Sequence, residues 1–310
     1  MRFIKSGSTI DFMGKRRLAL VFSGAAMVVA VIAIVLRGLN LGIDFTGGTL
    51  IEVSYRQDVD IAQVRKVLAE AGFENASVQR FGTPRDILIR LQQQDSGQNK
   101  VSDQVFASLS KAAGGQVELR RVEFVGPQVG DELTEDGALA VLVALMAILI
   151  YVALRFEWRF ALGSVIALVH DVLFTLGLFA LLQIEFDLTV LAAVLAVIGY
   201  SLNDTIVVFD RVRENFRKLR KGTPEEVINI SLNQTLSRTL MTSFTTILVL
   251  LALFFLGGEI IHAFAFALLV GIFIGTYSSI YVASTAALML GVSKADLMPV
   301  KKEGVVDDMP

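Results

Sequence analysis

Asp204 is the residue whose type and position point most directly to chemistry. It lies in a predominantly apolar stretch, residues 188 to 209, that is long enough to cross a bilayer. An ionised Asp at the centre of a membrane helix is unfavourable by about 2.5–3.5 kcal/mol, so such a group is normally protonated, paired or facing a hydrated cavity. Each of these states favours proton or ion traffic. The alternative interpretation is a packing role, in which Asp204 hydrogen-bonds a neighbouring helix.

The next apolar stretch begins with a cation and continues with hydroxyl groups. Arg238 immediately precedes this stretch, on the same side of the membrane as Asp210 and Arg211. Counted inward from that side, Asp204 lies about 9 Å inside the membrane. If the two helices are neighbours, Arg238 can reach toward Asp204, and the hydroxyl groups can hold water together with Asn203. Two simpler interpretations stay open, an interfacial anchor for Arg238 and helix packing for the hydroxyl groups. The hydroxyl-bearing residues are Thr239, Thr242, Ser243, Thr245 and Thr246.

A second carboxylate, Asp171, lies inside the apolar run from Phe160 to Leu182. It belongs to a small and polar helix face that suits close packing around an ionisable group. We interpret Asp171 either as a second member of a proton relay or as a packing residue. His170 points about 100° away from that face and is interpreted as a packed or interfacial histidine. The residues that share the face by their spacing of four are Gly163, Ala167, Asp171 and Thr175.

The composition identifies the class of protein that must position these residues. Of the 310 residues, 54% are hydrophobic and 19% are charged, which is more apolar than a soluble chain of this length. The net charge of −2 argues against a nucleic-acid partner. The chain has no cysteine and two histidines, and it carries no nucleotide-binding loop. We therefore expect an integral membrane protein that is not an enzyme and holds no metal or cofactor.

Windows of about 19 residues predict six transmembrane helices. The apolar run of the first is too long for the core of a signal peptide, so we expect it to be retained. Loops rich in Lys and Arg follow the second and fourth spans and predict a cytoplasmic location for those loops and for the termini, residues 1–17 and 291–310. The predicted spans are 18–36, 138–154, 160–182, 187–209, 239–257 and 263–290.

Residues 37–137 form one large hydrophilic insert, which this topology places outside the cytoplasm. Its pattern predicts the order β-α-β-β-α-β, so the expected fold is an α-helical membrane protein with an α+β ferredoxin-like domain between helices 1 and 2. The predicted strands are Thr49–Tyr55, Ser77–Phe81, Ile87–Gln92 and Gln116–Phe124, and the predicted helices are Ile61–Ala71 and Lys100–Ala112.

Two further segments have a recognisable local pattern. Thr223, Pro224 and Glu226 predict a capped helix start within residues 210–238. We expect that segment to be a cytoplasmic amphipathic connector, either lying on the membrane interface or solvated. The glycine-rich segment that begins at Gly42 lacks the Lys and the following helix of a phosphate loop. We interpret it as a turn from the first span into the first strand.

Three sequence runs carry a resemblance to a known family. GYSLNDTIVVFDRVREN begins at Gly199 and contains Asp204, LSRTLMTS begins at Leu236 and contains Arg238, and GIDFTGGT begins at Gly42. With the α/β insert and six spans, they resemble the SecD/SecF membrane proteins, and the first run is similar to the signature of the SecF branch. The resemblance covers nearly all of residues 10–290.

The resemblance implies a location, partners and a mechanism. The location is the bacterial inner membrane, with both termini cytoplasmic and the insert periplasmic. The implied partners are SecD in a heterodimer, the SecYEG translocon, YajC, unfolded preprotein clients and membrane lipid. The family belongs to the RND superfamily, in which protons moving through the spans are coupled to motion of periplasmic domains. Export of preproteins driven by the proton-motive force is the implied function.

Site residues follow from the same resemblance. Carried over by position, Asp204 is the membrane carboxylate for proton conduction and Arg238 is its basic partner. Asn203, Thr205 and Asp171 are added by adjacency and spacing. The conducted ion is a proton or a sodium ion.

Six spans and one insert look like half of a transporter built from two parallel repeats, so a partner of the same architecture is expected. Two other functions stay open. One is an RND-like half-transporter for a lipid or small solute, and the other is a structural scaffold of the translocon in which Asp204 is a packing residue.

Overall fold

The computed structural model describes residues 10–91, 98–219 and 221–293. Most of the predicted terminal segments 1–17 and 291–310 lie outside the described residues. Within the described ranges, six helical segments are long and apolar enough to cross a membrane, which confirms the prediction of six spans. These segments are Met13–Arg37, Pro127–Arg155, Trp158–Leu182, Leu188–Lys218, Pro224–Leu256 and Glu259–Met289.

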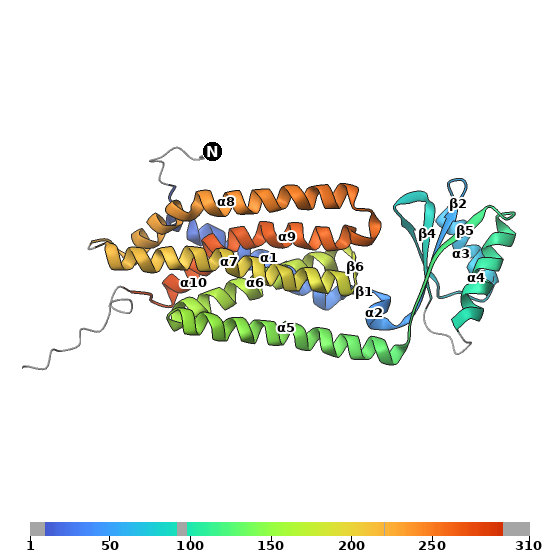
Figure 1. Ribbon diagram of the computed structural model, residues 1–310, viewed down its shortest axis with the longest axis horizontal. Helices are drawn as coiled ribbons and strands as arrows, with labels where there is room; N and C mark the ends of the chain where they lie inside the picture. Colours follow the sequence, from blue (N-terminus) through green and yellow to red (C-terminus); the bar gives the residue numbers. More distant parts are fainter. Residues whose placement is uncertain (1–9, 92–97, 220, 294–310) are drawn as a thin grey trace, which may run out of the picture.

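The spans run side by side along the long axis of the molecule, and the α/β domain caps one end of the bundle (Figure 1). Short 3₁₀ turns, η1 Met13–Lys15 and η2 Glu259–Ile261, precede the first and last spans. The last span is composite, because α9 His262–Ser278 passes through a π-helical turn, η3 Ser279–Ala283, into α10 Ser284–Met289. The other spans are α1 Arg16–Arg37, α5 Pro127–Arg155, α6 Trp158–Leu182, α7 Leu188–Lys218 and α8 Pro224–Leu256.

Helices α6 and α7 form the centre of the bundle. Half of the residues in the most apolar window of each are buried, a larger share than in the other four spans. Helix α7 is the least apolar of the six, and its polar residues need protein around them because lipid offers no hydrogen-bond partners. The two helices interlock through Phe160 and Phe209, whose ring centroids are 4.8 Å apart.

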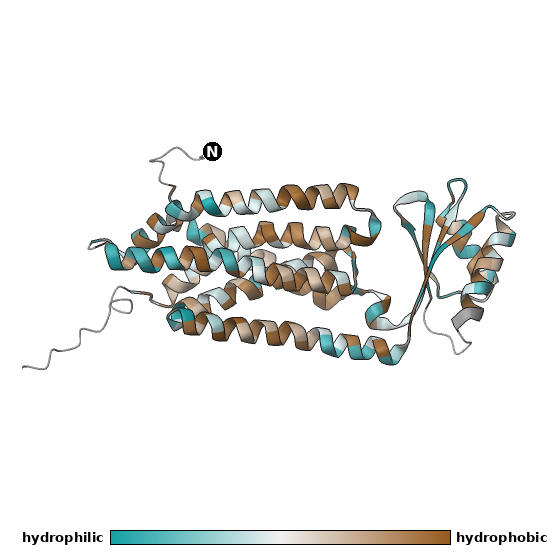
Figure 2. Cartoon of the chain, viewed as in Figure 1, coloured by the Kyte–Doolittle hydropathy of each residue, from teal (hydrophilic) through white to brown (hydrophobic). Residues whose placement is uncertain are grey.

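The predicted helix start at Thr223 is confirmed. The Thr223 hydroxyl accepts a hydrogen bond from the Glu226 backbone N–H at 3.3 Å, and Glu226 accepts one from the Thr223 N–H at 2.9 Å. Helix α8 then continues without a break to Leu256, and α7 extends to Lys218. The structure therefore differs from a separate connector at 210–238, because most of that segment belongs to the long helices α7 and α8. Figure 2 shows hydrophilic residues at the end of α7 and at the start of α8, which lie at the end of the bundle away from the α/β domain.

The α/β domain is a four-stranded antiparallel sheet with two helices on one face. The strand order is β3-β4-β2-β5. Apolar residues that alternate along β2 and β4, such as Ile51, Val53, Ile87 and Ile89, are fully buried beneath α3 and α4. In chain order the elements are β2 Gly48–Tyr55, α3 Ile61–Glu70, β3 Ser77–Phe81, β4 Thr83–Leu91, α4 Gln98–Ala112 and β5 Val117–Val125, which is the order β-α-β-β-α-β.

Two small elements attach the domain to the bundle. Strand β1 Asn40–Leu41, which follows α1, pairs in parallel with β6 Glu185–Phe186, which precedes α7. Arg90 of β4 forms an ion pair with Glu185 at 2.5 Å. Its guanidinium also donates to the Leu41 carbonyl at 3.4 Å. The sheet of the α/β domain is thus tied directly to the start of the helix that carries Asp204.

Candidate functional site

Asp204 is buried between three helical segments, and both of its carboxylate oxygens have partners. Its residue surface is 7% exposed. The Thr239 hydroxyl of α8 donates to Oδ1 at 2.6 Å, and the Ser279 hydroxyl of η3 donates to Oδ2. Two hydroxyl donors stabilise a charge on the carboxylate, and because a hydroxyl oxygen also accepts, they can equally bond a protonated carboxyl group. The site is therefore built to hold Asp204 in either protonation state.

Arg238 makes no direct bond to Asp204 within the described part of the chain, although its charge acts on the carboxylate from a distance. Its side chain is exposed, and among the described residues no ion pair joins it to Asp204. The next residue along α8, Thr239, bonds Asp204 instead, because successive helix positions differ by about 100° in direction. The structure thus brings the carboxylate together with the hydroxyl-bearing half of α8 and leaves the cation on the surface of the bundle.

The two neighbours of Asp204 in the sequence have different surroundings. Thr205 is 1% exposed within the bundle, whereas Asn203 is exposed. Asn203 continues a line of exposed small residues on α7 that includes Ala192, Ala196 and Gly199. A methyl group at Gly199 would meet nothing within 4 Å. This face of α7 is therefore uncovered by the chain itself.

The last span also carries a stripe of small residues, including Gly271 and Gly275, and this stripe does pack within the chain. A methyl group at Gly271 would lie 2.1 Å from Val197 of α7. One at Gly275 would lie 3.1 Å from Ser201 and 3.6 Å from the Asp171 carboxylate. Glycine at these positions allows α9 to approach α7 closely enough for side chains to reach the buried carboxylates.

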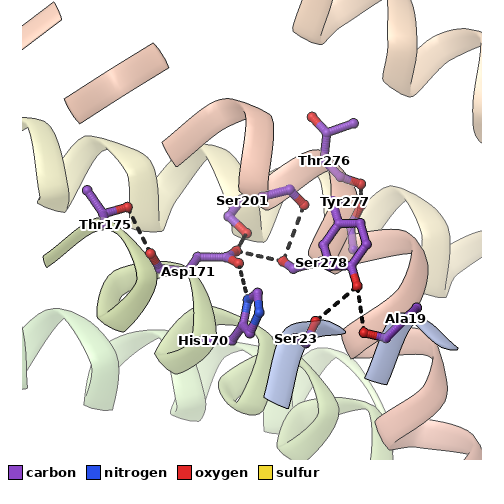
Figure 3. A network of polar contacts seen from close by, with 11 residues as sticks. Ala19, Ser23, His170, Asp171, Thr175, Ser201, Thr276, Tyr277 and Ser278 are labelled. Atoms are coloured by element: carbon purple, nitrogen blue, oxygen red, sulfur yellow. Dashed lines mark hydrogen bonds and ion pairs between the residues drawn. The ribbon is translucent and has the colours of Figure 1, made fainter. Parts of the chain in front are cut away.

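Asp171 is fully buried, and its carboxylate has three polar partners, as Figure 3 shows. Ser201 of α7 donates to Oδ2 at 2.5 Å, and Ser278 of α9 donates to the same oxygen at 2.7 Å. Nδ1 of His170 lies 2.9 Å from Oδ1. Asp171 therefore does join the polar interior, and His170, predicted as a packed or interfacial residue, is its direct partner.

Ser201 and Ser278 were not among the predicted site residues. For Ser278, the available signal was the run of hydroxyl-bearing residues in the last span, Thr276, Ser278, Ser279, Ser284 and Thr285. The π-helical turn begins at Ser279, and the Ser284 hydroxyl donates to the Ser279 carbonyl at 3.1 Å. At this junction the two serines serve different carboxylates, Ser278 bonding Asp171 and Ser279 bonding Asp204. Such turns are frequent at functional sites.

The glycine-rich segment after α1 is more than a turn. It contains a one-turn helix, α2 Ile43–Thr46, and Gly47 and Gly48 with φ of 66° and 125°. Such backbone conformations favour glycine because a Cβ would be strained there. A Cβ on Gly47 would also lie 3.1 Å from Pro127 at the start of α5. The segment thus joins α1, β2 and α5 at one crowded point.

These features define the class: a polytopic membrane protein of six spans, with an α/β domain inserted after the first span and two buried carboxylates in the bundle. The family follows from comparison with known proteins. The family model described as "Protein export membrane protein SecD/SecF, C-terminal" matches residues 105–293. A second one, described as "SecD/SecF GG Motif", matches residues 32–59. The chain belongs to this SecD/SecF family.

Relatives of full length agree with that assignment. A protein translocase subunit SecF from Vibrio alginolyticus is 53% identical over 314 residues, covering 100% of this chain and 99% of the relative. A protein of the same name from Pseudomonas aeruginosa is 50% identical over 308 residues, covering 99% of both chains.

Two solved structures share the fold. The crystal structure of SecDF, a translocon-associated membrane protein from Thermus thermophilus, matches with a TM-score of 0.83 and 40% identity over 93% of this chain. SecDF in its super-membrane-facing form matches with a TM-score of 0.67 and 39% identity over 94% of this chain. In both comparisons the present chain spans 39% of the SecDF chain.

Proposed function

We propose that this chain is the SecF-type subunit of a bacterial Sec protein-export machinery and uses the proton-motive force, together with a SecD-type partner, to drive or complete preprotein translocation. The observation that carries the proposal is the position of Asp204, a buried carboxylate inside a membrane span with a hydroxyl group on each oxygen. Such a group can bind and release a proton without losing its hydrogen-bond partners.

The uncovered face of α7 and α8 supports the need for a partner. Asn203 of α7 and Arg238 of α8 are exposed on transmembrane helices, and polar or charged side chains facing hydrocarbon are unfavourable. A second six-span subunit would cover them. The proposed partner is a SecD-type chain, because in the SecDF relatives a sequence like this one makes up only 39% of the protein.

In the proposed assembly, the bundle lies in the inner membrane with both termini cytoplasmic and the α/β domain periplasmic. The positions of basic residues support this orientation, because Lys and Arg favour the cytoplasmic side of a membrane protein. Helix ends that lie away from the α/β domain carry Arg155, Arg159, Arg213 and Lys218 (Figure 1). SecYEG, YajC, membrane lipid and unfolded preproteins are the remaining proposed partners.

In the proposed mechanism, Asp204 alternates between protonated and ionised states. Arg238 approaches the ionised carboxylate and withdraws from the protonated one, so the spans shift against those of the partner. One proton crossing the full field supplies about 2.3 kcal/mol per 100 mV, enough to shift a two-state equilibrium by more than about tenfold. The β1–β6 pair and the Arg90–Glu185 ion pair provide a physical link from α7 to the α/β domain.

The deciding experiment is preprotein translocation into inverted membrane vesicles that contain this chain and its partner. Wild type is compared with Asp204→Asn, with and without an uncoupler, and complex assembly is measured in parallel. Asp136→Asn, which alters an exposed carboxylate of α5, is the matched control. We expect Asp204→Asn alone to lose the gradient-dependent component. If an assembled Asp204→Asn complex retains it, a structural role replaces the proposal.

A further inference from the structure

His170 and Asp171 form a buried acid–imidazole pair that is distinct from Asp204. Their side chains are 6% and 1% exposed, and Nδ1 of His170 lies 2.9 Å from Oδ1 of Asp171. The second carboxylate oxygen is occupied by the hydroxyls of Ser201 and Ser278. Two hydroxyl donors thus face the carboxylate, and whenever Asp171 is ionised the 2.9 Å contact requires Nδ1 of His170 to carry the hydrogen.

The other ring nitrogen of His170 lacks a partner. Within the described part of the chain, Nε2 is buried and makes no hydrogen bond. The rings of Phe174 and Tyr277 lie beside the imidazole, each with its centroid 6.4 Å away. A buried polar atom without a partner is costly. When Nδ1 donates to Asp171, Nε2 is the basic nitrogen of the neutral imidazole and the ring nitrogen that can take a proton.

The pair is connected to Asp204 through two short segments of backbone. Ser278 and Ser279 are adjacent, and each bonds one of the two carboxylates. Ser201, which bonds Asp171, lies three residues before Asp204, and residues three apart share a helix face. The charges of the two sites therefore lie close together in a bundle that offers little screening.

The pair also lies close to α1. Tyr277, whose ring lies beside His170, donates its hydroxyl hydrogen to the Ala19 carbonyl at 2.8 Å. The same hydroxyl lies 3.0 Å from the Ser23 hydroxyl (Figure 3). Between Arg17 and Arg37, α1 contains no titratable side chain. Within the apolar stretches of the helices packed around the pair, the titratable side chains are Tyr151 of α5, Tyr200 and Asp204 of α7, Tyr277 of α9 and Tyr281 of η3. The remaining charged residues of α5, α6 and α7 lie toward the helix ends.

We infer that the His170–Asp171 pair is a second proton-binding site of this chain, with Nε2 of His170 as the atom that takes the proton. A hydronium ion delivers the proton and leaves as water, an N–H bond forms at Nε2, and the Nδ1–H bond to Asp171 is kept. The pair thereby changes from one net negative charge to none. The inference rests on the proposed function in that the same gradient supplies the proton.

Proton binding at the pair changes the charge beside Asp204. A neutral pair leaves Asp204 as the main negative charge of the interior, whereas an anionic pair opposes ionisation of Asp204 because like charges repel in a poorly screened interior. Occupancy of the two sites is therefore coupled. The chain then carries two coupled protonation sites rather than one.

The test uses nuclear magnetic resonance of the full chain in lipid nanodiscs with nitrogen-15 in its histidines. The chain contains only His170 and His262, so the variant His262→Gln assigns both signals. Spectra are recorded from about pH 5 to about pH 8, the interval in which histidine charge normally changes. We expect the His170 signal to titrate, with a midpoint that moves by about one pH unit or more in Asp171→Asn.

His262 is the internal control, since its Nδ1 contacts the Phe254 carbonyl and lies outside the cluster around Asp171. The pH response of its signal should be the same in wild type, Asp171→Asn and Ser278→Ala, which also reports on folding. Ser278→Ala retains the pair and removes one hydroxyl, so its midpoint should move by less than that of Asp171→Asn. The inference is overturned if His170 does not titrate in this interval, or titrates identically in wild type and Asp171→Asn.

This measurement separates the inference from the proposed function. It uses no preprotein, partner or gradient, so a His170 signal that does not titrate removes the second site and leaves the role of Asp204 in export untouched. Conversely, if Asp204→Asn exports normally while His170 titrates as expected, the proposed function fails and the protonation site remains.

Discussion

Asp44 accepts a hydrogen bond from the backbone N–H of Leu188, at 3.0 Å, across 144 residues of sequence. Leu188 is the first residue of α7, and Asp187 caps the same helix through the Val190 N–H at 2.8 Å. Two carboxylates therefore hold the first turn of the helix that carries Asp204. Asp44 belongs to the glycine-rich segment that leads into the α/β domain, so a movement of α7 is transmitted directly to the base of that domain.

Replacing Asp44 with Ala should loosen this junction. The substitution leaves the Leu188 N–H without its partner and removes a negative charge from the positive end of α7. We expect a loss of about 1 kcal/mol in stability, the usual effect of losing a helix cap. Thermal unfolding of the purified protein measures it, and Asp103→Ala, at an exposed position on α4, should have little effect. Equal unfolding temperatures for the two variants would contradict a capping role.

The attachment of the α/β domain should weaken as pH rises from acid. Burial raises the pKa of Glu185 above its ordinary value, and Arg90 opposes that shift only in part. The native state thus binds more protons than the unfolded state between the ordinary Glu pKa, about 4.3, and the raised value. Stability falls as pH rises through this window and levels off above it.

Hydrogen exchange at the Gly42 amide, which bonds the Phe186 carbonyl at 2.9 Å, reports on this attachment. Protection, corrected for the intrinsic exchange rate, should decrease through the window in wild type. Glu185→Gln should not show the change, since its amide does not titrate. A wild-type profile that matches Glu185→Gln would mean that Glu185 does not control the attachment.

The polar interior was only partly predictable from the sequence. Asp204 and Asp171 could be found because a carboxylate in an apolar span stands out without any knowledge of neighbours. Their partners depend on which helices meet and in which rotation. Arg238 was expected at Asp204 on grounds of charge, yet Thr239, one position further on, makes the contact.

The role of Ser278 could not be predicted for a related reason. In the last span, small residues recur in steps of four from Ala263 through Gly271 and Gly275 to Ser279. Ser278 lies about 100° off this stripe. The π-helical turn that starts there and the close approach at Gly275 bring Ser278 to Asp171. The small residues at Gly271 and Gly275 do indicate a close helix approach, whereas the π-helical turn has no local sequence signal that would place Ser278 at Asp171. By contrast, the cap at Thr223 is local and was predicted correctly.

Removing the two adjacent serine hydroxyls one at a time should have different effects on export. Ser279→Ala deprives Asp204 of one of its two hydroxyl partners, whereas Ser278→Ala affects Asp171. A hydrogen bond to a charged group contributes about 1.5–3 kcal/mol, so both variants should be less stable. Gradient-driven translocation into inverted vesicles, normalised to the amount of assembled complex, should fall further in Ser279→Ala. Equal losses in the two variants would argue that general packing, and not the surroundings of Asp204, limits export.

The uncovered face of α7 should be the surface that meets the partner. The chain has no cysteine, so a single cysteine at Ala196 provides a unique cross-linking site on the exposed line of small residues. Single cysteines are placed in turn along the spans of the SecD-type partner, and we expect Ala196→Cys to form a disulfide with one of them. The reason is that polar Asn203, on the same line, must be shielded from lipid by protein. Leu154→Cys is the control, since Leu154 is 85% exposed at the far end of α5 and apolar enough to face lipid. Cross-linking from Leu154→Cys with none from Ala196→Cys would place the partner on α5. The face of α7 would then need another polar neighbour.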